Sequence, residues 1–161
     1  MRLDVLFHPA AGEPMTIKTR PFVLLVEDNP ADSDLVEEAF AEAHIDCTLS
    51  ILRDGAQAIE FFERLDSGSS QACPDLVLLD LNLPKVGGDA VLERVRSSRA
   101  CKSVKVLIVS SSDAPNDRER AMQLGASEYF RKPSSLEQYM EFGPKVKTLL
   151  LGEERAGARR R

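Results

Sequence analysis

Three carboxylates stand directly behind two short apolar runs of this sequence. Glu27 and Asp28 follow the run 22–26, and Asp80 follows the run 76–79. Carboxylates that are brought together repel one another, so such a group must be neutralised by protonation or by a cation. Hard oxygen ligands of this kind suit Mg²⁺, which keeps some waters and takes phosphate oxygens as further ligands. A carboxylate can also act as a nucleophile and form an aspartyl-phosphate.

Hydroxyls and an ammonium occupy the corresponding places behind two later apolar runs. Ser110 and Ser111 follow the run 104–109, and Lys132 comes just after the run 127–130. Phosphoryl transfer needs positioning and charge neutralisation more than covalent help from the protein. An ammonium and a hydroxyl donor would supply both to the oxygens of a transferred phosphoryl group. These residue types together therefore predict a site for Asp phosphorylation.

The elements that must position these side chains are predicted by the apolar pattern. Strands are expected at residues 22–26, 48–52, 76–79, 104–109 and 127–130. Helices are expected from Asn29-Pro30, from Asp54, behind Gly87-Gly88, around Asp117–Leu124, and from Ser134 towards Leu151. Five strands alternating with five helices predict parallel βαβ units in a doubly wound α/β sheet. Such a sheet binds ligands at the carboxyl ends of its strands, where all the polar residues above would meet.

Gly143-Pro144 lies inside the last expected helix. Proline removes a backbone donor and clashes with the preceding turn, so the helix should be kinked or split there.

Each candidate residue also has an ordinary structural explanation when it is taken alone. Glu27 and Asp28 could be acids favoured by a helix dipole, Asp80 a loop cap and Lys132 a surface charge. The joint placement at successive strand ends favours the functional interpretation instead.

Four segments of the chain resemble the receiver domains of two-component response regulators. They are Leu-Leu-Val-Glu-Asp-Asn-Pro, Leu-Leu-Asp-Leu-Asn-Leu-Pro, Val-Ser-Ser and Arg-Lys-Pro, in the family's order along residues 21–150. The resemblance implies a five-stranded parallel sheet in the flavodoxin-like order 2-1-3-4-5, with helices on both faces. The Glu-Asp-Asn-Pro-Ala-Asp opening, the long loop before Pro74 and the late Gly-Pro further resemble stand-alone regulators paired with phytochrome-type histidine kinases.

The resemblance also implies a role for each residue of the acidic group. Asp80 becomes the phospho-acceptor, and Asp28 a direct ligand of Mg²⁺. Glu27 helps to hold the metal through water, and the backbone carbonyl of Asn82 completes the shell. The family usually has Asp in place of Glu27, and this change keeps the functional group.

The remaining roles fall on the later strand ends. Ser110 corresponds to the switch hydroxyl, where Thr is commoner, and Lys132 to the lysine that pairs with the phosphoryl group. Tyr129 stands where the family has its rotating aromatic residue. The Lys132-Pro133 bond is expected to be cis, as is usual in the family.

In function, the resemblance implies a switch in a phosphorelay. A sensor histidine kinase would donate the phosphoryl group, and slow self-dephosphorylation would end the signal. With no attached output domain expected, the output would be protein–protein contact or phosphate relay. The apolar length of the last helix predicts a homodimer through that helix. Three alternatives stay open: an aspartate-nucleophile phosphatase, which needs an acid where Asn82 stands; a degenerate receiver that only binds; and a flavin-binding flavodoxin-like protein.

Composition limits the setting of such a switch. The net charge of −5 argues against DNA binding, and no apolar run is long enough to span a membrane. Cys47, Cys73 and Cys101 show neither metal-ligand spacing nor a disulfide framework, which suits a reducing cytoplasm. The expected division is an N-terminal extension (1–20), a receiver domain (21–151) and a flexible basic tail (152–161).

Overall fold

The computed structural model describes residues 20–158, and side chains over residues 20–151. The predicted N-terminal extension lies outside this range except for Arg20. Of the predicted basic tail, only the backbone of residues 152–158 is described. The division into extension, domain and tail therefore stays a prediction.

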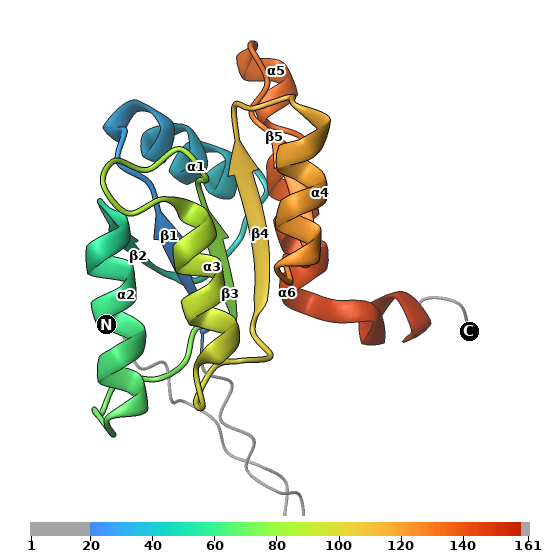
Figure 1. The fold of residues 1–161 in the computed structure, drawn as a ribbon. Coiled ribbons are helices and arrows are strands. Elements are labelled where there is room, and N and C mark those ends of the chain that lie inside the picture. The colour runs from blue at the N-terminus through green and yellow to red at the C-terminus, as the bar shows by residue number, and fades with distance from the viewer. Residues whose placement is uncertain (1–19, 159–161) are drawn as a thin grey trace, which may run out of the picture.

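Strands and helices alternate along the described chain (Figure 1). The strands are β1 (Phe22–Val26), β2 (Thr48–Leu52), β3 (Leu76–Leu79), β4 (Lys105–Ser110) and β5 (Glu128–Arg131). The helices are α1 (Pro30–Glu42), α2 (Gly55–Asp66), α3 (Gly88–Ser97), α4 (Pro115–Gln123), α5 (Leu136–Tyr139) and α6 (Phe142–Ala158). The predicted strands are confirmed, and β4 and β5 lie one residue later than expected.

The strands form one parallel sheet in the order β2-β1-β3-β4-β5. This order confirms the predicted doubly wound α/β fold. Within the described residues, no helix is both long and apolar enough to cross a membrane.

Both faces of the sheet are covered by helices. Alternate residues of a strand point to opposite faces, so each inner strand contributes to both cores. On one face, Leu76 and Leu78 of β3 belong to a buried cluster with residues of α1, α5 and α6. On the other face, Val77 and Leu79 are buried with residues of α2, α3 and α4. The continuous apolar runs of the inner strands follow from this double burial.

Two of the predicted helix starts, those of α1 and α2, are confirmed by their caps. The Asn29 side chain accepts a hydrogen bond from the Ala31 amide at 2.9 Å, and Pro30 is the first residue of α1. The Asp54 carboxylate accepts from the Gln57 amide at 2.7 Å at the start of α2. Both caps begin a helix within three residues of a strand end, which keeps the connections short.

The last helix is split, as predicted, but the break lies before Gly143-Pro144. α5 ends at Tyr139 and α6 begins at Phe142. Pro144 thus lies in the first turn of α6, where its missing N–H costs no intrahelical bond. A Cβ on Gly143 would stand 2.6 Å from the Ala39 carbonyl oxygen of α1, so glycine permits the close packing of the two helices.

Two expectations about covalent structure are wrong. The Lys132-Pro133 bond is not cis, since the described residues contain no cis peptide bond. A proline only weakens the preference for trans, so the sequence cannot settle this. Cys73 and Cys101 form a disulfide, with Cα atoms 5.8 Å apart, although the sequence shows no disulfide framework. Their spacing of 28 residues cannot reveal that the segments before β3 and β4 meet in the fold.

Candidate functional site

The register of the sheet brings the predicted polar residues to one edge. Val26 of β1 pairs with Leu79 of β3, so Glu27 and Asp80 leave neighbouring strands side by side. At the other end of the edge, the Lys132 amide donates to the Ser110 carbonyl at 2.8 Å. Four strand ends therefore converge on one site, as the sequence predicts.

Three of the gathered carboxylates lie close enough to share a cation. Glu27, Asp28 and Asp80 each offer an oxygen, and these oxygens lie within 4.8 Å of one another. Glu27 and Asp80 are buried, whereas Asp28 is exposed. An all-oxygen donor set with several negative charges and one open side fits a hard divalent cation such as Mg²⁺.

The Lys132 ammonium lies at the centre of the acids. Its Nζ donates to Glu27 Oε1 at 2.6 Å, to Asp32 Oδ2 at 2.9 Å and to Asp80 Oδ2 at 3.2 Å. Burial alone lowers the pKa of Lys132, but the hydrogen bonds to Asp32 and Glu27 outweigh it and hold the pKa above its ordinary value. The side chain therefore stays charged and neutralises part of the acidic group.

The pKa of the Glu27 carboxyl is raised above its ordinary value. Burial raises its pKa to about 7, although the hydrogen bond from Lys132 opposes the rise and the Asp80 charge adds to it. A buried carboxylate anion is unfavourable, so a carboxyl with a raised pKa readily takes up a proton or binds a cation. The role of Glu27 in holding a metal stays a prediction.

Asp80 is held by its own loop. Its Oδ1 accepts from the Asn82 amide at 2.9 Å, while Oδ2 faces Lys132. Behind it, a Cβ on Gly88 would collide with the Asp80 carbonyl oxygen, so only glycine lets α3 begin this close to Asp80. The Asn82 side chain lies 3.4 Å from the hydroxyls of Ser110 and Ser111. The role of the Asn82 carbonyl as a ligand stays a prediction.

The hydroxyl and the aromatic residue of the predicted switch are both engaged. Ser110 is fully buried at the end of β4, and its Oγ accepts from the Ser112 amide at 3.2 Å. The Tyr129 hydroxyl donates to the Ser112 carbonyl at 3.0 Å, and Arg118 lies over its ring at 5.8 Å. Both side chains thus contact the same loop before α4, while their movement stays a prediction.

Sequence reasoning missed Asp32. The residue lies in the first turn of that helix and accepts a hydrogen bond from Lys132. A usable signal exists, because a helix that begins right behind a strand end brings its first turn to the same edge of the sheet.

Arg53 and Tyr139 were also missed. Arg53 follows β2, and its Nη1 donates to the Ser33 hydroxyl at 2.9 Å and lies 3.4 Å from the Glu27 carbonyl, so it steadies the loop behind β1. The Tyr139 hydroxyl is buried and makes no hydrogen bond in the described part of the chain. Burial raises the pKa of this hydroxyl to about 12. The charge of Lys132 opposes the rise, and that of Asp32 adds to it. Neither residue carried a motif that the sequence could reveal.

Comparison with known proteins decides the family of this fold and site. The family model "Response regulator receiver domain" matches residues 23–142. The chain belongs to the response regulator receiver family. This outcome confirms the resemblance stated from the sequence.

Two relatives show where in the family the chain stands. It is 35% identical over 137 residues to the probable methanogenesis regulatory protein FilR2 of Methanothrix harundinacea, covering 84% of this chain and 88% of that one. It is 37% identical over 114 residues to the response regulator Rcp1 of Synechocystis sp., covering 71% of this chain and 78% of Rcp1.

Two solved structures share the fold. The Mn²⁺-bound form of Rcp1 has a TM-score of 0.71 at 33% identity, covering 80% of this chain and 92% of that one. The phosphorylated cyanobacterial phytochrome response regulator RcpA has a TM-score of 0.73 at 31% identity, covering 83% of this chain and 96% of that one.

Proposed function

We propose that this chain is a phospho-acceptor switch, in which Asp80 receives a phosphoryl group from the phosphohistidine of a sensor kinase. The observation that carries the proposal is the position of Asp80. One of its oxygens lies 3.2 Å from the Lys132 ammonium, and its carboxylate belongs to the cluster with Glu27 and Asp28. Formation of an aspartyl-phosphate needs a nucleophilic carboxylate with positive charge beside it, which Lys132 and a metal held by the acids would supply.

The chain's own residues would divide the work of the transfer. An Asp80 oxygen attacks phosphorus in line, a P–O bond forms, and the P–N bond to the kinase imidazole breaks. Lys132 neutralises one phosphoryl oxygen, and Ser110 donates a hydrogen bond to another. Mg²⁺, held by Glu27, Asp28, Asp80 and the Asn82 carbonyl, would when bound neutralise further negative charge of the phosphoryl group.

The bonds of Lys132 suggest how the modification changes the protein. In this structure its ammonium is shared between Glu27, Asp32 and Asp80. New phosphoryl oxygens on Asp80 compete for the same donors, so the contact with Asp32 on α1 weakens. Ser110 and Tyr129 would then shift towards the site and bias the surface formed by the last two strands and helices between two states.

The proposed activity is that of a switch with slow self-dephosphorylation, rather than that of a turnover enzyme. An aspartate-nucleophile phosphatase needs an acid two residues after the nucleophile, and that position is Asn82 here. Steady hydrolysis of a phosphate ester by the purified chain would favour the phosphatase instead.

The proposed donor is a phytochrome-type histidine kinase. The support is the likeness to RcpA, which is described as a phytochrome response regulator. The proposed output is contact with another protein in the cytoplasm, because the net charge of −5 does not favour DNA.

We further propose a homodimer through the last helix. Leu151 of α6 is an exposed large apolar side chain, and Leu149 and Leu150 beside it are partly buried. Sedimentation that shows only a monomer at high concentration, with and without phosphorylation, would count against this dimer.

Transfer from a kinase tests the proposed function. A phytochrome-type kinase autophosphorylated with labelled ATP is mixed with the wild-type chain and with the Asp80→Asn variant, in Mg²⁺. We expect the label to pass to the wild type only. Equal transfer to the variant would contradict Asp80 as the acceptor, whereas transfer from another class of kinase alone would contradict only the phytochrome pairing.

A further inference from the structure

A disulfide lies at the edge of the sheet opposite to the phospho-acceptor. Cys73 comes just before β3 and Cys101 just before β4, so both stand near the amino ends of paired parallel strands. Asp80 and Ser110 stand at the carboxyl ends of the same two strands. The proposed phosphotransfer makes no use of the cysteines.

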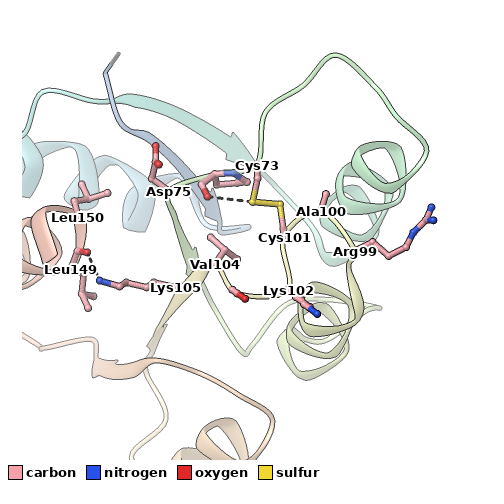
Figure 2. A pocket seen from close by; sticks show the side chains of 12 residues that line it. Cys73, Asp75, Arg99, Ala100, Cys101, Lys102, Val104, Lys105, Leu149 and Leu150 are labelled. Carbon is pink, nitrogen blue, oxygen red and sulfur yellow. Dashed lines mark hydrogen bonds between the residues drawn. A yellow bond between two sulfur atoms is a disulfide. The ribbon is translucent and has the colours of Figure 1, made fainter. Parts of the chain in front are cut away.

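A surface cavity gives access to this disulfide. The cavity has a volume of about 510 Å³ and is lined by both cysteines and by Arg99, Lys102 and Lys105 (Figure 2). Cys101 is buried, with 2% of its surface exposed, whereas Cys73 is half-buried. A cavity of this size accommodates a small molecule. An attacking group would therefore reach the sulfur of Cys73 rather than that of Cys101.

The lining of the cavity favours an anion. Arg99, Lys102 and Lys105 bring three positive charges, against the single carboxylate of Asp75. That carboxylate accepts a hydrogen bond from the Phe22 amide at 2.7 Å, which turns it towards β1. Arg99 and Lys105 donate only to backbone carbonyls, those of Asp66 and Leu149, so their charges are not cancelled by these bonds.

We propose that Cys73 and Cys101 form a reversible thiol–disulfide site whose reductant is a small anionic thiol such as glutathione, entering by this cavity. A glutathione thiolate attacks Cys73 Sγ, a mixed disulfide forms, and Cys101 Sγ leaves as a thiolate. A second glutathione thiolate attacks the mixed disulfide, which releases oxidised glutathione and the Cys73 thiolate. The protein disulfide gains two electrons, two glutathione thiols lose them, and each cysteine takes up a proton. The cationic lining attracts the incoming thiolate and stabilises the leaving one.

The surroundings also suit the reduced form. Cys73 Sγ lies 3.5 Å from the Pro74 carbonyl oxygen, which can accept a hydrogen bond from the sulfur once it is a thiol. The Cys101 amide donates to the Ser98 hydroxyl at 3.2 Å, and that hydroxyl donates to Asp66 at 2.7 Å. These bonds hold the segment before β4 without the help of sulfur, so the fold is expected to survive reduction.

Cys47 is the internal control. It is the free cysteine of the described chain and is half-buried. Burial raises the pKa of its thiol, which makes it a poor nucleophile near neutral pH. It should stay reduced under all conditions below.

The test counts thiols on the whole chain in glutathione buffers of increasing oxidised fraction. After acid quenching and unfolding, free thiols are alkylated and counted by intact mass. We expect three alkylated thiols in the reducing buffers and one, Cys47, in the oxidising buffers, with native circular dichroism throughout. Three free thiols in every buffer would overturn the proposal, and so would a disulfide that persists in excess glutathione while the chain stays folded.

The role of the cavity is tested by the rate of reduction. Glutathione should reduce the double variant Arg99→Gln, Lys102→Gln at about one third of the wild-type rate or slower. Added salt should slow the reduction of the wild type similarly. The neutral thiol 2-mercaptoethanol should reduce both proteins at the same rate. Equal rates with glutathione would overturn the anionic reductant. None of these readouts involves a phosphoryl group, so they fail or succeed independently of the proposed switch.

Discussion

At the scale of single residues, Lys132 is the side chain on which most of the site depends. Its ammonium bonds three carboxylates, and its side chain is only 10% exposed. Glu27 and Asp80 are buried beside it, so they rely on this cation for the compensation of their charge.

Lys132→Met should therefore destabilise the metal-free protein. We expect the free energy of unfolding at neutral pH to fall by about 2 kcal/mol, because buried carboxylates lose their charged partner. Added Mg²⁺ should restore more stability to the variant than it adds to the wild type, since the ion supplies the missing charge. Urea unfolding with and without Mg²⁺ measures both effects.

Lys145→Met is the matched control for this change. Lys145 pairs with Glu128 at 3.5 Å, and both side chains are more than a third exposed. Its loss should change stability by no more than about 0.5 kcal/mol. Equal effects of the two variants would show that the acids do not depend on Lys132.

The Tyr139 hydroxyl shows whether a buried polar group without a partner lowers the stability of this protein. It is buried without a hydrogen-bond partner among the described residues. Tyr139→Phe removes only this group, so the free energy of unfolding should stay the same or rise by up to about 1 kcal/mol. A clear loss of stability in thermal or urea unfolding would mean that the hydroxyl has a partner, such as a buried water.

The residues of the site differ in how far the sequence could predict them. Glu27, Asp80 and Lys132 follow strand ends, and a parallel sheet must gather strand ends at one edge. Asp32 and Tyr139 lie on helices instead. The start of α1 behind β1 indicates that Asp32 lies near this edge. Whether its carboxylate faces Lys132, and where Tyr139 points, depends on how far each helix is rotated against the sheet, which the apolar pattern does not fix closely enough.

At the scale of elements, helix packing explains the features that the sequence misplaced. Pro144 predicts an interruption, but where the chain breaks is decided by the packing of Phe142 and Val146 against α1 and the sheet. The disulfide likewise depends on two connecting segments that meet only in the folded chain.

Gly143→Ala tests the contact of α6 with α1. The added Cβ would stand 2.6 Å from the Ala39 carbonyl oxygen and 2.7 Å from the Ala43 Cβ. We expect a loss of about 2 kcal/mol in the free energy of unfolding from overpacking. Gly87→Ala is the control, because its Cβ meets only the Leu81 carbonyl oxygen at 3.9 Å, so the two variants should differ clearly.

Asp66 joins the end of α2 to α3 and the segment that carries Cys101. It accepts hydrogen bonds from Ser98 at 2.7 Å, Arg94 at 2.8 Å and the Ala100 amide at 3.1 Å, which hold its pKa well below the ordinary 3.8. A lowered pKa stabilises the fold above about pH 4, and this contribution is lost as the pH falls below that value.

Asp66→Asn should therefore be less stable than the wild type at neutral pH. The difference should shrink as the pH falls below about 4, where the wild type loses its advantage. Urea unfolding across this range measures it. A difference that stays constant with pH would show that the charge of Asp66 is not what stabilises this corner.

At the scale of the whole molecule, the sheet separates two kinds of chemistry. Its carboxyl edge holds the acids, Lys132 and the hydroxyls, and its amino edge holds the disulfide and its basic cavity. The strands β3 and β4 contribute to both edges, yet each edge has hydrogen bonds of its own. Lys132 donates to Asp80 at the carboxyl edge, and the Cys101 amide donates to Ser98 at the amino edge. We expect phosphorylation and reduction to be separable for this reason.

The most direct test of the central claim is phosphorylation by acetyl phosphate with Mg²⁺, followed by intact mass. The wild type should gain one phosphoryl group, the gain should disappear when the metal is chelated, and Asp80→Asn should gain none. No gain by the folded wild type, or the same gain by the variant, would contradict Asp80 as a metal-dependent phospho-acceptor.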